Sequence, residues 1–336
     1  MKVAVIGAGS IGKRHLSTLY KLSPSEGINE IRCYDKNKTR TKEAVTDKKE
    51  IIVSSTLEDA VKGVDLVFLC VPTSLHYDVW SKISKLDDFN YFIEKPLSHT
   101  FKNCDEMIFH QKRIKKHAFI GYMLRLHPVL NNAKDLIGKD TIGRVLNVRA
   151  ESGFYLPFWH PWEDYRDFYM SWKTGGGGAL LDTSHEIDYL MWMFGDIAYA
   201  QGYSQTISDL EMTADDYTSC LFEFKNGIMG ELHLDLLQPE ESRYLKVIGT
   251  KGVLIADLIS NNVKYNTIEK TDWVFNDLQV SYDDIYSKEV INVLKCIRGE
   301  ENMTTSIDEG AKVMQVVDAI RRSSSYGTRI KLPIYD

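Results

Sequence analysis

The sequence predicts two domains: an α/β domain with a parallel sheet, then an α+β domain with a large, mainly antiparallel open sheet. Three observations predict this architecture. An apolar run leads at once into a glycine-rich turn, strands and helices then alternate to about residue 122, and β-prone segments dominate from residue 197 onward. A chain of 336 residues is long enough for two sizeable cores. We place the domains at 1–122 and 123–336, and the last helices could pack back on the first domain.

The first twelve residues read M-K-V-A-V-I-G-A-G-S-I-G and match a dinucleotide-binding fingerprint. Residues 2–6 fit a buried strand. Gly7 permits the tight turn, Gly9 lets a pyrophosphate approach the backbone, and Gly12 lets helix and strand pack closely. The helix expected from Ser10 would point its free amide groups at the phosphates. A glycine-rich turn of some other α/β protein is the alternative, and the strand, helix and second strand around the motif make it the weaker one.

The rest of the first domain alternates strand and helix patterns. We expect further strands at 29–34, 51–54, 65–71, 90–93 and 117–121, and helices at 10–22, 38–47, 57–61, 74–86 and 100–113.

Asp35 lies where the second strand should end. A carboxylate there would bond both hydroxyls of an adenosine ribose and would repel a 2′-phosphate, which favours NAD over NADP. Lys36, Lys38 and Arg40 follow closely and could accommodate that phosphate instead. NAD is therefore the favoured cofactor, with NADP as the alternative.

Two later turns should meet at the carboxyl edge of this sheet, where ligands of open α/β folds bind. The strand at 65–71 ends in P-T-S-L-H at residues 72–76, and the next strand ends in Glu94-Lys95-Pro96. Thr73 and Ser74 could instead cap the following helix. The charged pair could likewise be a solvated turn, and taken alone the two interpretations are equal.

Four motifs together resemble the Gfo/Idh/MocA oxidoreductases. They are G-A-G-S-I-G, C-V-P-T-S-L-H at 70–76, E-K-P-L at 94–97 and G-G-G-G-A-L-L-D-T-S-H-E-I-D at 175–188. The resemblance implies a Rossmann domain followed by the α+β domain. It also implies that Lys95 and His185 are catalytic, with Asp182 as a helper carboxylate. Many relatives have one more residue between the aspartate and the histidine, so the role of Asp182 is the less secure.

The expected cofactor contacts come from the glycine loop, the end of the second strand and the two later turns. They are Gly7, Gly9, Ser10, Ile11, Gly12, Asp35, Arg40, Val71, Pro72, Thr73, His76, Glu94 and Lys95. No metal is expected, although Asp182 and His185 with His160 could in principle ligate zinc.

The second domain begins with G-Y-M-L-R-L-H-P at 121–128, and a helix is expected from 128 to 137. Arg125 either touches substrate or forms an interdomain salt bridge.

A strand at 144–152 precedes a loop, 154–172, that holds nine aromatic residues. These aromatics could stack on sugars while His160, Glu163, Arg166 and Asp167 bond hydroxyls or a carboxylate, or the loop could be an arm against a second subunit. A mixture is preferred. The expected substrate contacts are Arg125, Tyr155, Trp162, Arg166 and Lys173.

Four glycines at 175–178 enter a helix expected from 179 to 194. Asp182, His185 and Asp188 recur every three residues and should share a stripe of it, and the glycines favour a cleft there over a solvated face. Strands are expected at 197–207, 216–225, 228–237, 243–249, 252–257 and 261–267, with a type I′ hairpin at Asn226-Gly227. Two helices, 284–298 and 307–325, complete the chain.

The composition excludes several classes of protein. A net charge of −6 offers no basic footprint for nucleic acid, and no polybasic cluster suggests a membrane surface. The five cysteines have no paired spacing, which indicates reduced thiols. No signal peptide and no apolar run of membrane-spanning length is evident. We therefore expect a cytoplasmic protein with a small-molecule substrate.

These expectations combine into one function. We expect an NAD(P)-dependent dehydrogenase acting on a secondary alcohol of a sugar or sugar derivative, including nucleotide sugars. His185 would serve as the base, Lys95 would stabilise the alkoxide at the same hydroxyl, and Asp182 would orient the imidazole. The alternatives are NAD-dependent non-redox sugar chemistry such as glycoside hydrolysis, and a dinucleotide-sensing regulator. Assembly into a homodimer or homotetramer through the exposed sheet face is expected.

Overall fold

The computed structural model describes residues 1–334. The chain forms two compact units. The first contains Met1–Met123 and Tyr282–Ala311, and the second contains Leu124–Ser281 and the chain from Lys312 on. Helix α11 (Ile307–Tyr326) therefore contributes its first residues to one unit and the remainder to the other. Whether residues 1–122 fold as a separate domain stays a prediction.

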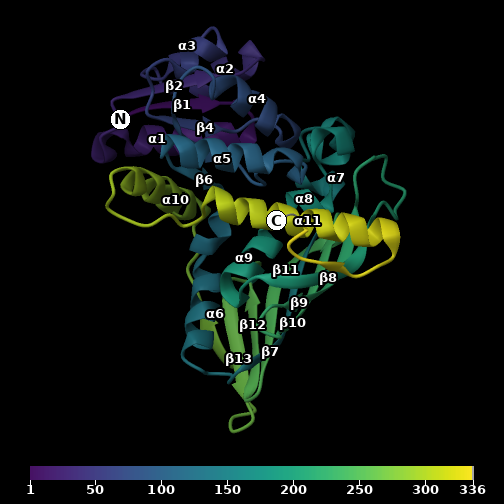
Figure 1. Ribbon diagram of the computed structural model, residues 1–336. Helices are drawn as coiled ribbons and strands as arrows, with labels where there is room; N and C mark the ends of the chain where they lie inside the picture. The colour runs from purple at the N-terminus through teal and green to yellow at the C-terminus, as the bar shows by residue number, and fades with distance from the viewer. Residues whose placement is uncertain (335–336) are drawn as a thin grey trace. The chain divides into compact units, whose positions relative to one another are not determined.

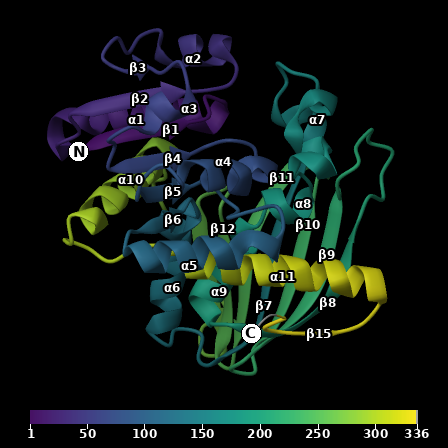
Figure 2. The same cartoon turned by 45° about the horizontal axis from the view of Figure 1, so that its top comes forward.

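The first unit is built on a six-stranded sheet in the order β3-β2-β1-β4-β5-β6, and its strand pairs are all parallel. Figure 2 shows β1, β4, β5 and β6 in this order. The strands are β1 (Lys2–Ile6), β2 (Glu30–Tyr34), β3 (Ile52–Val53), β4 (Leu66–Leu69), β5 (Asn90–Ile93) and β6 (Ala118–Ile120). The helices are α1 (Ser10–Glu26), α2 (Lys38–Val45), α3 (Leu57–Val61), α4 (His76–Ile83), α5 (Cys104–Ile114) and α10 (Tyr282–Ile297), with short 3₁₀ helices at Thr73–Leu75 and Phe101–Asn103.

The central strands β1 and β4 are almost entirely apolar, as expected where helices pack on both faces of a parallel sheet. β4 and β5 are buried at every position. One core cluster joins Val3 and Val5 of β1, Leu16 of α1, and Val290 and Leu294 of α10. Helix α10 thus packs against α1 although some 260 positions separate them in the sequence. The predicted parallel α/β architecture is confirmed.

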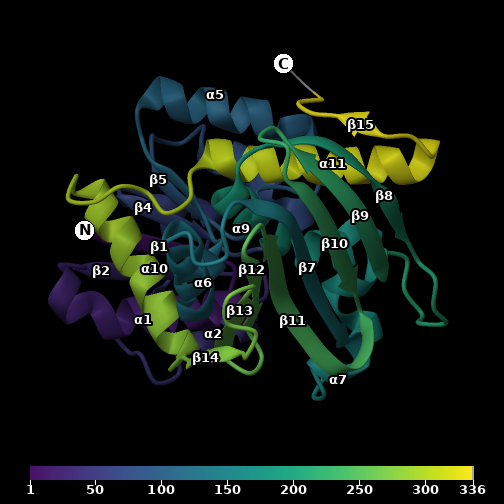
Figure 3. The same cartoon turned by 90° about the horizontal axis from the view of Figure 1, so that it is seen from below.

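The second unit is built on a nine-stranded sheet in the order β14-β13-β12-β11-β7-β10-β9-β8-β15. Figure 3 shows β11, β7, β10, β9 and β8 side by side. The strands are β7 (Val145–Tyr155), β8 (Ile197–Gln205), β9 (Tyr217–Phe224), β10 (Met229–Asp235), β11 (Leu237–Gly249), β12 (Gly252–Asp257), β13 (Asn262–Thr267), β14 (Val274–Asp277) and β15 (Ile330–Lys331). Only the β7–β10 pair is parallel among the pairs described. A large, mainly antiparallel sheet was predicted and is confirmed.

Helices cover one face of this sheet. They are α6 (Pro128–Gly138), α8 (Ala179–Asp182), α9 (His185–Phe194) and the second part of α11 (Figure 1). Ala150, Leu232 and Phe222 point to the covered face and are buried, whereas Arg149 and Leu221, one position along their strands, are exposed. This alternation leaves the opposite face of the sheet open.

Three local predictions were wrong. The single helix expected at 179–194 is broken after Asp182: Thr183 leaves helical geometry (φ −98°, ψ 28°), and the amide of Ser184 bonds the Leu181 carbonyl three residues back. The hairpin at Asn226-Gly227 is not type I′, since Gly227 has a positive φ (84°) and Asn226 does not. Strands β14 and β15 were not expected, and each is a short edge strand without a long alternating pattern.

Among the described residues, no helix is both long and apolar enough to cross a membrane.

Candidate active site

The glycine loop after β1 has the geometry that a bound pyrophosphate requires. Gly7 has φ 102°, and a Cβ atom on Gly12 would collide with the Gly7 carbonyl oxygen, so α1 can approach β1 only with glycine there. A Cβ atom on Gly9 would meet nothing within 4 Å, so the space above Gly9 is open. Gly9 caps α1 without a side-chain hydrogen bond, and Ser10 and Ile11 begin its first turn, which contains no acidic residue. The loop therefore leaves amide donors for an anionic ligand.

Asp35 follows β2 and holds this loop to the second strand. Its carboxylate accepts hydrogen bonds from the amides of Ala8 (2.7 Å) and Asn37 (2.7 Å). Lys36, Lys38 and Arg40 are exposed beyond it, and Arg40 lies in the first turn of α2. The carboxylate expected to bond the ribose is thus fixed beside the glycine loop, and the alternative site for a 2′-phosphate also remains accessible.

His76 connects the two later turns of this unit. It is buried, with Nδ1 3.0 Å from the Pro96 carbonyl oxygen and Nε2 2.9 Å from the Val71 carbonyl oxygen. Burial lowers its pKa, which favours the neutral ring. Thr73 is also buried, whereas Pro72 is exposed. His76 therefore holds the turns together, and a direct cofactor contact by its ring stays a prediction.

The E-K-P turn follows β5, next to β4 in the sheet. Lys95 is partly exposed, whereas Glu94 is buried. Glu94 Oε1 lies 2.6 Å from Nε2 of His15, a fully buried residue of α1. The solvated turn considered from the sequence is therefore excluded for Glu94. His15 was missed, and the signal available was its place three residues after Gly12, on the buried side of α1.

In the second unit, Arg125 forms a buried pair with Asp188 of α9. Its Nε and Nη2 atoms donate to the two carboxylate oxygens at 2.9 and 2.7 Å, and both side chains are less than 5% exposed. The neighbouring Glu186, also buried, accepts from Arg243 of β11 at 2.7 and 3.1 Å. Arg125 thus anchors α9, and its predicted contact with substrate is an additional role that this pairing does not demonstrate.

Asp182 and His185 lie on either side of the helix break. Asp182 ends α8 and accepts a hydrogen bond of 2.6 Å from the Tyr169 hydroxyl. His185 is the first residue of α9 and is 7% exposed. The two residues therefore do not share one stripe of a continuous helix, as was expected. One lies at the end of α8 and the other at the start of α9. Their catalytic roles stay predictions.

Gly175, Gly177 and Gly178, before α8, pack closely against other parts of the protein. A Cβ atom on Gly177 would collide with the carbonyl oxygens of Tyr169 and Met170, and one on Gly178 would collide with the Asp215 carboxylate. Asp215 in turn accepts from the amide of Leu180 at 2.8 Å, and burial raises its pKa. Sequence reasoning missed Asp215, because an acid in a loop between strands gives no signal of its burial.

The aromatic loop contains α7 (Leu156–Trp159) and 3₁₀ helices at Tyr165–Asp167, Tyr169–Ser171 and Lys173–Gly175. Its predicted polar groups bond one another: Arg166 pairs with Asp164 (2.6 Å) and Glu211 (3.1 Å), and His160 Nδ1 lies 2.6 Å from Glu163. Trp162 is 74% exposed. Lys173 is exposed, and Tyr155 at the end of β7 packs edge-on against Phe158. The loop is ordered by local contacts and still offers exposed aromatic surface.

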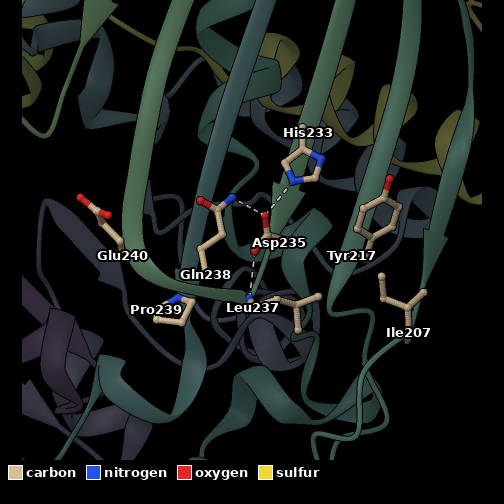
Figure 4. Close-up of a pocket in the computed structure, with 8 residues that line it drawn as sticks. All are labelled: Ile207, Tyr217, His233, Asp235, Leu237, Gln238, Pro239 and Glu240. Carbon is tan, nitrogen blue, oxygen red and sulfur yellow. Dashed lines mark hydrogen bonds and ion pairs between the residues drawn. The ribbon is translucent and has the colours of Figure 1, made fainter.

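A cavity of about 510 Å³ lies elsewhere, on the open face of the nine-stranded sheet (Figure 4). At its centre Asp235 accepts hydrogen bonds from His233 (2.7 Å) and Gln238 (2.6 Å). The cavity is lined by Ile207, Tyr217, His233, Asp235, Leu237, Gln238, Pro239 and Glu240. None of the predicted catalytic or cofactor residues lines it, so it is a separate feature of the open face.

Within the described part of the chain, no three His, Cys, Asp or Glu side chains lie close enough to hold a metal ion. His160, Asp182 and His185 accordingly form no such cluster.

The comparisons with known proteins cover nearly the whole chain. A family model of the Gfo/Idh/MocA group, described as oxidoreductase family, NAD-binding Rossmann fold, matches residues 1–122. A second model, described as oxidoreductase family, C-terminal alpha/beta domain, matches residues 134–332.

Individual relatives have low sequence identity to this chain but align with most of its length. The scyllo-inositol 2-dehydrogenase (NAD(+)) of Bacillus subtilis is 24% identical over 92% of this chain and 90% of its own. The 2,7-anhydro-N-acetylneuraminate hydratase of Mediterraneibacter gnavus is 24% identical over 76% of this chain and 67% of its own. Among solved structures, levoglucosan dehydrogenase in complex with NADH and L-sorbose aligns with a TM-score of 0.86 at 18% identity, over 99% of both chains.

Proposed function

Because the chain belongs to the Gfo/Idh/MocA oxidoreductase family, we propose that it is an NAD(P)-dependent dehydrogenase acting on a secondary alcohol of a sugar or sugar derivative. One observation carries the proposal. The E-K-P turn presents Lys95 at the carboxyl edge of a parallel sheet, and at the same edge β1 ends in an open glycine loop. Ligands of open α/β sheets bind at that edge.

The residues of the first unit fit a nicotinamide dinucleotide. The amides of the glycine loop and the N-terminus of α1 would hold the pyrophosphate, and Asp35 would bond the adenosine ribose. NAD, when bound, supplies the hydride acceptor. NAD is the proposed cofactor in preference to NADP, since a carboxylate at the end of β2 repels a 2′-phosphate.

The proton chemistry is assigned to three side chains. An alcohol that gives up hydride must also lose its hydroxyl proton, and His185 is the proposed base that takes it. The Lys95 ammonium stabilises the developing alkoxide. Asp182 orients the His185 imidazole and is itself held by the Tyr169 hydroxyl. The remaining proposed contacts with the sugar are Arg125, Tyr155, Trp162, Arg166 and Lys173.

The substrate class follows from the relatives and from the aromatic loop together. The dehydrogenases similar to this chain are named for scyllo-inositol and levoglucosan, which are polyhydroxylated rings. Exposed aromatic side chains such as Trp162 offer flat apolar faces of the kind on which sugar rings stack. The aromatic loop is therefore the proposed specificity element.

The test is the absorbance of reduced nicotinamide after the full-length protein is mixed with NAD and a panel of inositols, aldoses, anhydrosugars and nucleotide sugars. We expect reduction with at least one member, and loss of that signal in Lys95→Ala. If no member of the panel supports reduction although NAD binds, the dehydrogenase proposal is wrong.

A second candidate is non-redox sugar chemistry with the same cofactor. One specific observation favours it: a relative covering 76% of this chain is named a hydratase, and hydration transfers no net hydride. Under this alternative a sugar product would form without accumulation of reduced cofactor.

The proposed catalytic residues also argue against a purely sensory role, because a regulator that only binds dinucleotide requires neither a base nor an ammonium at the reacting carbon.

Assembly through the open face of the nine-stranded sheet is also proposed, as a homodimer or homotetramer. Leu221, Met229 and Tyr203 are each about half exposed on this face, with Ile207 at its edge. Such apolar surface is typical of contacts between protein chains. Light scattering that finds a monomer at micromolar concentration would contradict the proposal.

The five buried, free cysteines suit a reducing compartment, and the cytoplasm is the proposed location.

A further inference from the structure

A cluster of buried polar side chains lies beneath the E-K-P turn, entirely within the first unit. His15 of α1, Glu94 at the end of β5 and Glu289 of α10 are 0%, 8% and 6% exposed. Charged and polar groups are rarely buried to this extent without a specific partner. The dinucleotide-binding fingerprint includes neither His15 nor Glu289, so the burial of these two side chains beside Glu94 needs another explanation.

His15 fixes one oxygen of the Glu94 carboxylate. Its Nε2 lies 2.6 Å from Oε1, and its ring packs edge-on against Phe92 at 4.9 Å. Its Nδ1 has no hydrogen-bond partner among the described residues. Since Nε2 faces a carboxylate, we assign the ring proton to Nε2, which donates to Glu94.

The second oxygen of Glu94 faces the turn itself. Oε2 accepts a hydrogen bond of 3.2 Å from the backbone amide of Lys95. A Cβ atom on Gly121, just after β6, would lie 3.2 Å from the same oxygen, so glycine leaves the space that the carboxylate occupies. Glu94 is thus held between His15 on one side and the backbone of Lys95 on the other.

Glu289 completes the surroundings of this carboxylate. Tyr286, one turn earlier in α10, places its ring 5.9 Å from that of His15, so Glu289 shares the side of the helix that faces the cluster. Burial, and then the charge of Glu94, raises the pKa of Glu289 well above its usual range. Arg14, a charged residue next to His15 in α1, lies over the Tyr286 ring at 4.7 Å and pairs with Asp283 of α10 at 3.3 Å. A neutral Glu289 spares Glu94 the repulsion of a second carboxylate.

We propose that His15 is a positioning residue of the enzyme: it orients the Glu94 carboxylate, which holds the backbone of Lys95 and so sets where the Lys95 ammonium lies during hydride transfer. This inference rests on the proposed function, because it assumes that Lys95 acts in turnover. A displacement of about 1 Å in a reacting group can cost about a hundredfold in rate. The hydrogen bond from His15 therefore affects kcat without touching substrate or cofactor.

The experiment compares His15→Leu, which removes the donor, with His15→Gln, whose amide can donate from nearly the same place. His110→Leu is the matched control, because His110 packs against Trp80 and contacts no part of the E-K-P turn that the structure describes. Gly121→Ala presses on the same Glu94 oxygen from the other side and remains informative if His15→Leu fails to fold. For each variant, kcat and the KM for NAD are measured with the sugar that the panel identifies. The rate of reductive methylation of Lys95 is measured by mass spectrometry.

We expect His15→Leu and Gly121→Ala to lower kcat by about tenfold to a hundredfold, with the KM for NAD changed less than about threefold. His15→Gln should recover most of the rate, and His110→Leu should match the wild type. The labelling rate of Lys95 should change in the two impaired variants alone. Unchanged kcat and unchanged labelling in folded His15→Leu would overturn the inference. Labelling does not depend on turnover, so altered labelling together with full activity of Lys95→Ala would reject the proposed catalytic role and retain the positioning role.

Discussion

Two arginine–aspartate pairs in the second unit have the same chemistry in opposite environments. Arg125 and Asp188 are 4% and 1% exposed, whereas Arg166 and Asp164 in the aromatic loop are 49% and 40% exposed. Both arginines reach the two oxygens of their carboxylate. Water screens the exposed pair, so it costs little to form or to break, while the buried pair must stay intact because either partner alone would be an uncompensated charge.

The same contrast exists in the first unit. His15 and Glu94 form a buried pair, and Lys13, two residues earlier in α1, forms an exposed one with Glu43 at 2.9 Å. Buried pairs therefore lie next to the proposed catalytic positions, Lys95 and His185, and exposed pairs lie in the segments proposed to meet substrate or solvent. The difference teaches that burial fixes the backbone beside the proposed catalytic residues, whereas the exposed pair in the proposed specificity loop can rearrange at little cost in free energy.

The largest expected effects come from the proposed catalytic groups. Lys95→Ala and His185→Ala should each lower kcat by about two to four powers of ten, with NAD affinity nearly unchanged, because each removes a group that acts on the reacting hydroxyl. The double variant should lose less than the product of the two effects. Steady-state kinetics and calorimetric titration with NAD provide the measurements. Near-normal turnover in either single variant would remove that residue from the mechanism.

The next effect compares the two pairs directly. Arg125→Met should lower the free energy of unfolding by about 3–5 kcal/mol, because it leaves Asp188 charged and buried. Arg166→Met is the matched control and should leave stability unchanged within error. Urea denaturation of both variants decides the comparison. Equal losses would show that burial does not separate the two pairs.

A smaller effect is expected from Glu289→Gln and depends on pH. The raised pKa of Glu289 in the folded protein means that the unfolded chain loses this proton first as pH rises above about 4.5. Wild-type stability contributed by this group is thus complete below that pH and declines as pH rises towards the folded pKa. Glutamine cannot ionise. The free energy of unfolding of the variant, taken relative to that of the wild type, should therefore be higher at neutral pH than at acid pH. A stability difference that is constant across the pH range would contradict the assignment.

The smallest expected effect concerns cofactor choice. Asp35→Ala should narrow the preference for NAD over NADP by about tenfold, because it removes the charge that repels a 2′-phosphate. Calorimetric titration with each cofactor measures it. Tighter binding of NADP to the wild type would transfer the role to Lys36, Lys38 and Arg40.

Patterns that depend on neighbours in the sequence were predicted well. The glycine loop, the parallel arrangement of the first sheet and the alternation of the second all follow from local spacing, and the E-K-P turn was placed correctly at the end of β5. For contacts between distant segments, the sequence suggested only that the last helices could pack back on the first domain, and it did not predict which residues they would contact. Nothing near residue 289 indicates that Glu289 faces a cluster formed by residues 15 and 94.

The break between α8 and α9 shows a second limit. The apolar spacing of residues 187–194 is helical and continues the pattern before it, so periodicity alone predicts one helix. The i→i−4 hydrogen bonds stop at Ser184, whose amide bonds the Leu181 carbonyl, and no glycine or proline near Thr183 marks this change in the sequence. Similarly, the sequence left open whether the polar residues of the aromatic loop bond a ligand or a second subunit, and the structure pairs several of them with one another.

The most direct test of the central claim follows the hydride itself. A sugar that the protein turns over is prepared with deuterium at the carbon bearing the reacting hydroxyl, and the nicotinamide is analysed by mass spectrometry after incubation with excess NAD. A dehydrogenase acting through Lys95 and His185 predicts one deuterium per reduced nicotinamide with the wild type, and almost none with Lys95→Ala or His185→Ala. If a sugar product forms but no deuterated reduced nicotinamide accumulates, the account is contradicted and non-redox sugar chemistry is favoured.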